Sequence, residues 1–387
     1  MKVKLSQAFD LQMGKTPSRN IAEYWGGDHK WVSIADIGNA GKYISETKEC
    51  ITDDGVSGSG IKVVPKGTVI MSFKLSIGKT AITSEDMYTN EAIMAFIDKG
   101  IYPVDPNYLY HLCCGTDWTA GTNKAVMGLT LNKATLSEKM INLPSVEEQK
   151  DIAEKLDEVD SLINIQQRQL AKLDELVKAR FIELFGDLHS TKFPKCKMAE
   201  ICNIKHGYAF SGEFFTEEDN NILLVTPGNF KVGGGFQEKK CKFFMGEYSE
   251  EYVLNCGDLI VTMTDLSKNM DTLGYSAIVP STNRVYLHNQ RIGLFVGMSE
   301  NINKVFLMYF MQTNEYRDSI IASATGSTVH HTSPSKILDC DIFLPPIELQ
   351  DQFAAFVEQT DKSKLAVKQS LEKLETLKQS LMQQYFG

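Results

Sequence analysis

The chain has 387 residues, of which 43% are hydrophobic and 23% charged, and its formal net charge is -9. This composition is typical of a globular protein with two or three domains. No stretch approaches the roughly 20 consecutive apolar residues of a membrane span, and residues 1–10 lack the basic-then-apolar pattern of a signal peptide. We therefore expect a cytoplasmic protein that has no membrane partner.

The acidic balance is unfavourable for nucleic-acid binding, because non-specific affinity comes from Lys and Arg side chains that neutralise phosphates. Residues 1–140 carry 15 basic and 15 acidic groups, and residues 187–346 carry 14 and 18. Any contact with DNA must therefore come from local clusters or be supplemented by a partner. The eight cysteines include no Cys-x-x-Cys, so we expect reduced thiols, no metal and no cofactor.

The first globular segment, residues 1–140, contains loops in which Gly, Ser, Thr and Asn lie beside lysine. Short polar side chains and backbone amides can hold phosphates, while Asn and Lys can reach base edges in the major groove. The candidate DNA-binding residues here are Lys15, Thr16, Ser18, Lys74, Lys79, Thr122, Asn123 and Lys124. For each residue taken alone, an ordinary solvated loop is the competing interpretation.

Two motifs of this segment suggest enzymes only superficially. Gly14-Lys15-Thr16 and Gly78-Lys79-Thr80 end like a phosphate-binding loop, but its first glycine is replaced by phenylalanine in both. Without that glycine the backbone cannot wrap a phosphate, so nucleotide hydrolysis is not predicted. Asp105-Pro106-Asn107-Tyr108 echoes a signature of adenine methyltransferases, and we interpret it as the start of a helix.

The next segment, residues 141–186, is predicted to contain a long helix. Between residues 147 and 185, mostly apolar positions recur in alternate steps of four and three, which is the seam of a coiled coil. Pro144 precedes the helix and Gly186 suits its end. At 1.5 Å per residue, about 39 helical residues would be some 58 Å long.

The second globular segment, residues 187–341, has similar loops. Its candidate DNA-binding residues are Tyr208, Thr264, Lys268, Asn269, Ser327, Thr328, His330 and His331. Because adjacent side chains of an extended segment point to opposite faces, His330 and His331 are not expected to share a metal. The glycine run of residues 232–236 is interpreted as a hairpin turn rather than a methyl-donor site.

The closing segment, residues 342–387, aligns without a gap on residues 141–186, with 13 of 46 pairs identical. Two matched helices of one chain should pair with each other. Leu162, Leu176 and Phe181 fall outside the first seam, and we expect them to be exposed until a partner covers them. From the seam alone, a dimerisation coiled coil unrelated to DNA is the competing explanation.

The duplication extends to the globular segments. Gly14 matches Gly207 and Ser18 matches Ser211 near the two beginnings. Fainter landmark pairs follow, namely Gly67/Gly257, Asn90/Asn289, Phe96/Phe295 and Gly121/Gly326. Each half therefore joins a globular segment in which few residues match the other half to a helical segment in which more residues match.

These features resemble the specificity subunits of type I DNA restriction-modification systems over essentially the full length. The resemblance is carried by GKTPS at 14–18, HKWVSIADI at 29–37, KGTVIMS at 66–72, NCGDLIVTMT at 255–264 and HNQRIGLF at 288–295. Its most specific part is the helix start that occurs twice, as LPSVEEQ at 143–149 and LPPIELQ at 344–350.

The resemblance implies an α+β fold in which two mixed α/β target-recognition domains, residues 1–140 and 187–341, are separated by two long antiparallel helices in a pseudo-two-fold repeat. It implies a non-catalytic protein that reads an asymmetric, two-part sequence in double-stranded DNA, one half per domain. The implied partners are two methyltransferase subunits, docked on the helical segments 141–186 and 342–387, and restriction subunits of the same complex. The alternative is an orphan or inhibitory coiled-coil assembly protein of this family that does not read DNA.

Overall fold

The computed structural model describes the chain except for residues 75, 120–130, 190 and 240. The described residues form two compact units. Unit 1 consists of residues 1–168 and 368–387, and unit 2 consists of residues 169–367. Each unit contains a mixed α and β globular part together with a portion of both long helices, which confirms the predicted fold class.

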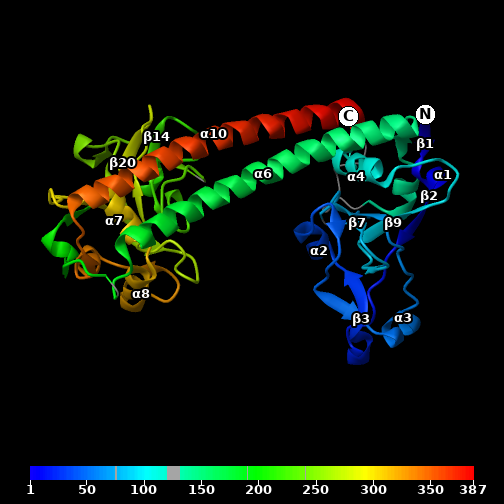
Figure 1. Ribbon diagram of the computed structural model, residues 1–387, viewed down its shortest axis with the longest axis horizontal. Helices are drawn as coiled ribbons and strands as arrows, with labels where there is room; N and C mark the ends of the chain where they lie inside the picture. The colour runs from blue at the N-terminus through cyan, green and yellow to red at the C-terminus, as the bar shows by residue number, and fades with distance from the viewer. Residues whose placement is uncertain (75, 120–130, 190, 240) are drawn as a thin grey trace. The chain divides into compact units, whose positions relative to one another are not determined.

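Unit 1 is built on a five-stranded sheet. In spatial order its strands are β2 (Phe9–Met13), β9 (Ile93–Asp98), β6 (Val69–Ser72), β7 (Thr80–Thr83) and β4 (Tyr43–Ile44). Every residue of β6 and β7 is buried, so these two antiparallel strands lie at the centre of the core. The helix α4 (Pro106–Gly115) packs against both strands and lies beside the first part of the long helix α6 (Figure 1).

The remaining elements of unit 1 are short. A second sheet contains β5 (Glu49–Ile51), β3 (Trp25–Val32) and β8 (Tyr88–Thr89), and a separate pair contains β1 (Lys2–Lys4) and β10 (Met140–Asn142). The short helices are α1 (Leu5–Ala8), η1 (Ala22–Tyr24), α2 (Ile34–Asn39), α3 (Asp53–Ser59) and α5 (Lys133–Ser137). The helix α4 begins at the predicted place, because the Asp105 side chain accepts hydrogen bonds from the amides of Asn107 and Tyr108 and Pro106 fills the first helical position.

Unit 2 is built on two sheets. The first has the spatial order β12 (Asn203–His206), β21 (Ile292–Val296), β17 (Leu259–Thr262) and β19 (Ser276–Ile278). The second has the order β13 (Phe215–Thr216), β15 (Lys242–Phe244), β14 (Ile222–Val225), β20 (Val285–His288) and β16 (Val253–Leu254). Residues 232–236 form the predicted turn, which is closed by a bridge between Phe230 and Phe236.

The remaining elements of unit 2 are two strand pairs and several short helices. The pairs are β11 (Lys195–Lys197) with β23 (Asp341–Phe343), and β18 (Thr264–Asp265) with β22 (His330–His331). The helices are η2 (Met198–Glu200), η3 (Gly212–Phe214), η4 (Pro227–Asn229), η5 (Glu250–Tyr252), α7 (Lys304–Phe310), α8 (Asn314–Ser323) and α9 (Pro334–Leu338).

The two units share a topology although few of their residues match. The antiparallel succession β2-β9-β6-β7 of unit 1 corresponds strand for strand to β12-β21-β17-β19 of unit 2. In each unit a parallel pair lies in the second sheet, namely β3 with β8 and β14 with β20. The duplication inferred from thin sequence matches is therefore present in the fold.

The landmark pairs occupy equivalent positions. The side-chain oxygens of Asn90 and Asn289 each accept a hydrogen bond of 3.0 Å from the amide two residues further along. Gly67 and Gly257 have φ angles of +79° and +82° in the turns before β6 and β17, a conformation that favours glycine. Gly121 lies outside the described residues.

Gly14 and Gly207, which match between the two halves of the chain, both lie where the backbone passes very close to another backbone segment. A Cβ atom at Gly14 would lie 2.1 Å from the carbonyl oxygen of Thr89, and one at Gly207 would lie 2.3 Å from that of Asn289. We expect Gly14→Ala and Gly207→Ala each to lower the free energy of unfolding by about 1–3 kcal/mol, because no rotamer change can relieve a clash with backbone. Chemical denaturation measures the loss.

The matched control for this prediction is Gly41→Ala. A Cβ atom at Gly41 would meet nothing within 4 Å, and its φ is not positive. Its unfolding free energy should stay within about 0.5 kcal/mol of the wild-type value. Equal losses for Gly14→Ala and Gly41→Ala would contradict the steric explanation.

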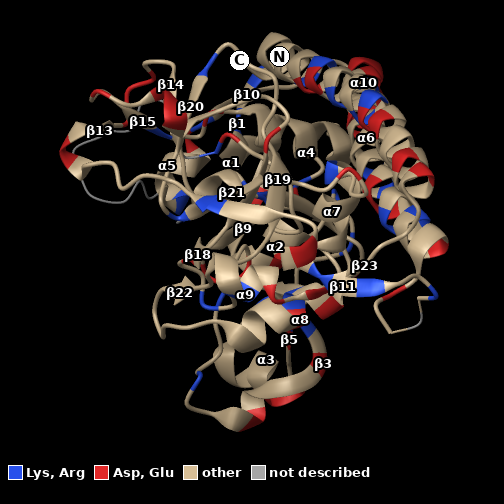
Figure 2. Ribbon diagram, turned by 90° about the vertical axis from the view of Figure 1, so that its left-hand side faces the viewer, with Lys and Arg blue, Asp and Glu red and all other residues tan. Residues whose placement is uncertain are grey.

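The two predicted long helices are α6 (Val146–Phe185) and α10 (Ile347–Phe386), each of 40 residues. Their seam positions are buried or half-buried, and Leu156 on α6 and Phe353 on α10 are both 0% exposed. Their outer sides carry Lys and Arg interspersed with Asp and Glu (Figure 2). Among the described residues, no helix is both long enough and apolar enough to cross a membrane.

Charged side chains join the two helices inside each unit. In unit 1, Asp160 of α6 pairs with Lys378 of α10 at 2.5 Å, and in unit 2 Asp174 pairs with Lys364 at 2.7 Å. The helices are antiparallel in unit 2, because Phe181, which follows Asp174 on α6, contacts Phe353, which precedes Lys364 on α10.

One prediction about the helix surfaces is wrong. Leu162 and Leu176 are exposed as expected, at 46% and 50%, but Phe181 is only 4% exposed. The Phe181 ring packs against Phe306 of α7 and Phe353 of α10, with ring centres 5.7 and 5.4 Å away. The globular part of unit 2 thus covers a position that lies outside the seam of the two helices.

The most specific repeated residue, the glutamine of the helix start, ties each long helix to its globular part. The buried Gln149 side chain accepts a hydrogen bond from the Asp105 amide at 2.9 Å and donates to the carbonyls of Pro103 and Pro144, both at 3.1 Å. In unit 2, Gln350 repeats all three contacts, accepting from the Asn303 amide at 2.9 Å and donating to the carbonyls of residues 301 and 345.

Candidate nucleic-acid interface

Four of the eight predicted residues of unit 2, Tyr208, Thr264, His330 and His331, lie on four segments that are hydrogen-bonded side by side. These segments, residues 207–208, 288–292, 262–265 and 330–332, are called the unit 2 ladder. They lie at the end of the first sheet where β12 and β17 finish and β21 begins.

Backbone hydrogen bonds join the ladder from one side to the other. The Tyr208 amide donates to the His288 carbonyl at 2.8 Å, and the Met263 amide donates to the Arg291 carbonyl at 2.9 Å. The Thr332 amide then donates to the Met263 carbonyl at 3.0 Å. Tyr208 and the histidines of β22, far apart in the sequence, are thereby brought to one surface.

The predicted side chains of the ladder differ in exposure. Tyr208 is 50% exposed and its ring lies against Phe210 and Tyr252, with ring centres 5.1 and 5.0 Å away. His331 is exposed, whereas Thr264 is buried and its hydroxyl lies 3.2 Å from the His331 Nδ1 atom. Thr264 is therefore placed to orient His331 rather than to contact a ligand itself.

Lys268 and Asn269 are exposed in the loop of residues 264–273, which is fixed at its base by Asp265. The Asp265 carboxylate is 4% exposed and accepts hydrogen bonds from the Ser267 amide at 2.6 Å and from the Thr272 hydroxyl at 2.7 Å. Within the loop, the Met270 carbonyl accepts a hydrogen bond of 2.8 Å from the Arg317 side chain of α8. These contacts fix the loop at its base and at Met270.

Ser327 and Thr328 are exposed in the turn that leads into β22. The ends of this turn are joined by two hydrogen bonds between the backbones of Thr325 and His331, at 2.8 and 3.0 Å. His330 is half-buried, on the neighbouring position of the same strand. The last four predicted residues of the chain are therefore adjacent to the ladder or part of it.

The ladder contains one buried histidine, His288, which bonds to another residue of the same segment. His288 is 1% exposed, and its Nε2 atom lies 2.8 Å from the Ile292 carbonyl oxygen. Burial lowers the pKa of His288, so the ring is neutral near pH 7 and its Nε2 atom donates this hydrogen bond. The turn between β20 and β21 is closed by this contact.

Unit 1 has an equivalent ladder, formed by residues 14–15, 89–93 and 72–74. The Lys15 amide donates to the Thr89 carbonyl at 2.8 Å, and the Phe73 amide donates to the Ala92 carbonyl at 3.0 Å. The segments that contain Lys15 and Lys74 therefore lie on opposite sides of residues 89–93, as residues 207–208 and 262–265 lie on opposite sides of residues 288–292 in unit 2.

Some of the predicted side chains of unit 1 already contact other residues of the chain. The Lys15 ammonium donates to the Ser59 carbonyl, and the Thr16 hydroxyl donates to the Glu91 carboxylate. Lys74 lies beside the Phe73 ring, with its ammonium 5.2 Å from the ring centre. The remaining described candidates, Ser18 and Lys79, are exposed, and Thr122, Asn123 and Lys124 lie outside the described residues.

Two arginines next to these ladders were missed by the sequence analysis. Arg291 is exposed in the middle of the unit 2 ladder. In unit 1, the Arg19 guanidinium lies 3.7 Å above the Trp25 ring and donates to both carboxylate oxygens of Glu49, at 2.5 and 2.8 Å. Arg291 lies in the motif HNQRIGLF, but its central position follows only from the pairing of distant strands.

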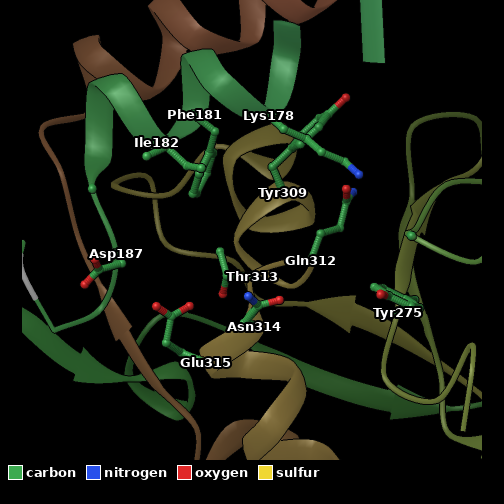
Figure 3. A pocket seen from close by; sticks show the side chains of 12 residues that line it. Lys178, Phe181, Ile182, Asp187, Tyr275, Tyr309, Gln312, Thr313, Asn314 and Glu315 are labelled. Atoms are coloured by element: carbon green, nitrogen blue, oxygen red, sulfur yellow. The ribbon is translucent and has the colours of Figure 1, made fainter. Parts of the chain in front are cut away.

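A cavity of about 490 Å³ lies elsewhere in unit 2, at the end of α6 (Figure 3). Its wall includes Phe181 and Tyr309, with Asp187 and Glu315 on one side and Lys178 near Tyr309 on the other. None of the predicted candidates that the structure describes lines it. Among the described residues there is also no group of three or more His, Cys, Asp or Glu that could hold a metal ion.

Comparisons with known proteins agree with this architecture. A family model described as the type I restriction modification DNA specificity domain matches twice, over residues 1–175 and 192–378. The MjaVIII specificity subunit of a type I restriction enzyme from Methanocaldococcus jannaschii is 24% identical, over 98% of this chain and 90% of that protein. The MjaIX specificity subunit from the same organism is 32% identical over 49% of this chain, but over only 44% of its own length.

A solved structure concerned with the assembly and conformational transition of the type I restriction-modification system covers 100% of this chain and 97% of its own, with a TM-score of 0.63 and 16% identity. At this identity the likeness shows the fold. The double family match spans nearly the whole chain, and it falls on both halves of the duplication. This chain therefore belongs to the specificity subunits of type I restriction-modification systems, which are the non-catalytic components of those complexes.

Proposed function

We propose that this chain reads a two-part DNA sequence, one half with each globular domain, and presents it to methyltransferase and restriction subunits. The observation that carries the proposal is the pair of ladders, at equivalent ends of two sheets with the same topology. The backbone of the ladders is alike while their exposed side chains differ, with Lys15 where the other has Tyr208. Two ladders with equivalent backbones but different exposed side chains are suited to the recognition of two different half-sites.

The reading domains are proposed to be residues 1–140 and 187–341, with the helical segments 141–186 and 342–387 between and after them. Two methyltransferase subunits would dock on these segments, and the restriction subunits would join through the complex. Exposed leucines support the docking, since Leu176 on α6 and its repeat equivalent Leu377 on α10 are 50% and 46% exposed. A neutral or acidic surface is compatible with DNA reading if those partners supply part of the phosphate contacts.

A domain exchange tests this proposal. The full chain is co-expressed with its cognate methyltransferase, and N6-methyladenine is mapped by long-read sequencing. We expect a split motif, and replacement of residues 187–341 by the same region of another specificity subunit should change one half of it. A continuous motif, or a change in both halves, would contradict one half-site per domain. Absence of any methylation while the complex assembles would favour the alternative of an assembly protein that does not read DNA.

A further inference from the structure

The second globular segment contains three arginines, and two of them have hydrogen-bond partners within the chain. Arg284 donates to both carboxylate oxygens of Asp219 at 2.7 Å, and this interaction raises the pKa of Arg284. Arg317 is 8% exposed, and it donates to the Met270 carbonyl. Arg291 is exposed, and within the described part of the chain its guanidinium has no hydrogen-bond or ion-pair partner.

The backbone of Arg291 is fixed on both sides although its side chain is free. Its amide donates to the Asn289 side chain at 3.0 Å, and its carbonyl accepts from the Met263 amide at 2.9 Å. The preceding residue, Gln290, donates its amide to the Tyr208 carbonyl at 2.9 Å. Arg291 therefore extends from the centre of the unit 2 ladder, between Tyr208 on one side and the β18–β22 pair on the other.

Unit 1 has no counterpart of this side chain. The equivalent position in its ladder is Ala92, whose carbonyl accepts the corresponding hydrogen bond from the Phe73 amide. Arg19 is the single arginine of residues 1–140, and it is already occupied by Glu49 and the Trp25 ring. A free guanidinium at the middle of the ladder thus distinguishes the second domain from the first.

We propose that Arg291 reads a guanine in the half-site of the second domain, by donating two hydrogen bonds to its O6 and N7 atoms in the major groove. This assignment rests on the proposed function. Arginine bound through two donors to guanine is the commonest base-specific contact between proteins and DNA, and a side chain on a rigid backbone is suited to it. A contact to a phosphate would use the same charge but would carry no sequence information.

The test uses the complex of the full chain with its methyltransferase and duplexes that contain the mapped motif. Each G·C pair of the half-site assigned to residues 187–341 is replaced in turn by A·T. We expect the wild-type complex to lose about 5- to 150-fold in affinity at one of these positions. With Arg291→Ala, the original and the substituted duplex at that position should bind equally, and discrimination at every other position should persist.

Lys268→Ala is the matched control, because Lys268 is an exposed cation on the neighbouring loop. It should weaken all duplexes to the same extent and lower the salt dependence of binding. Uniform weakening by Arg291→Ala with intact discrimination would overturn the assignment in favour of a phosphate contact, and unchanged binding would overturn it as well.

If Arg291→Ala binds no duplex, Arg291→Gln decides, because a glutamine side chain pairs with the N6 and N7 atoms of adenine rather than with the O6 and N7 atoms of guanine. A retained preference for G·C at that position would overturn the assignment, and loss or reversal of the preference would support it. A wild-type complex that binds no split motif at all would instead refute the proposed function.

Discussion

Asp265→Ala is expected to lower the free energy of unfolding by about 2–4 kcal/mol and to weaken binding of the half-site read by the second domain. The mutation removes a buried acceptor from the Ser267 amide, the Thr272 hydroxyl and the Leu273 amide, which donates at 3.0 Å. Each buried donor left without a partner costs about 1–3 kcal/mol, with partial relief where water enters. Denaturation of the chain and gel-shift titration of the complex measure the two effects.

The same carboxylate predicts a pH dependence. Burial alone would raise the pKa of Asp265, but hydrogen bonds from Ser267 and Thr272 outweigh burial and lower it below its ordinary value of 3.8. Because the folded pKa is depressed, this stabilisation is complete above the unfolded pKa and is lost as pH falls through the folded pKa. Below about pH 4, acidification should therefore reduce the stability of the wild type more than that of Asp265→Ala.

Asp271→Ala is the matched control, since Asp271 is exposed in the same loop. Its unfolding free energy should change by less than about 0.5 kcal/mol. Asp265→Asn keeps one acceptor oxygen and should fall between the wild type and Asp265→Ala. Similar losses for Asp265→Ala and Asp271→Ala would mean that the loop is not fixed by this carboxylate.

Gln350→Leu should lower the free energy of unfolding by about 3 kcal/mol. Leucine has a similar size but cannot accept from the Asn303 amide or donate to the carbonyls of Asn301 and Pro345. The loss follows from about 1–3 kcal/mol for each buried polar group left unpaired. Hydrogen exchange should locate the loosening at residues 301–303 and at the first turn of α10.

Gln149→Leu is the parallel experiment in unit 1, where all three tryptophans of the chain lie. It should shift the unfolding transition reported by tryptophan fluorescence. Gln352→Leu is the control, because Gln352 is exposed two residues after Gln350. If Gln352→Leu destabilised the chain as much as Gln350→Leu, the contacts of the buried glutamine would not explain why it occurs in both halves.

Local and periodic features could be predicted from the sequence. The coiled-coil seams fixed the extent of α6 and α10 to within a residue or two, because a heptad pattern depends only on spacing along one helix. The start of α4 at Asp105-Pro106 and the turn at residues 232–236 followed from local backbone preferences of proline and glycine. The duplication followed from matched residues such as Gly14 and Gly207.

The composition of the candidate interface depended on tertiary structure. Thr264 was selected with its exposed neighbours, yet it is buried beneath His331, while Arg291 was overlooked although it is free and central. Phe181 was expected on an outer face and is covered by α7.

The sequence by itself determined the duplication, the two long helices and the family, because these depend on periodicity and on residues compared at a fixed offset. Which side chains share a surface was decided only by the pairing of strands that lie up to about 120 residues apart, as Tyr208 and His331 do. Register between such strands is set by the burial of whole faces and by the turns that join them. Those interactions are non-local, so no pattern within one segment could reveal the neighbours of Arg291.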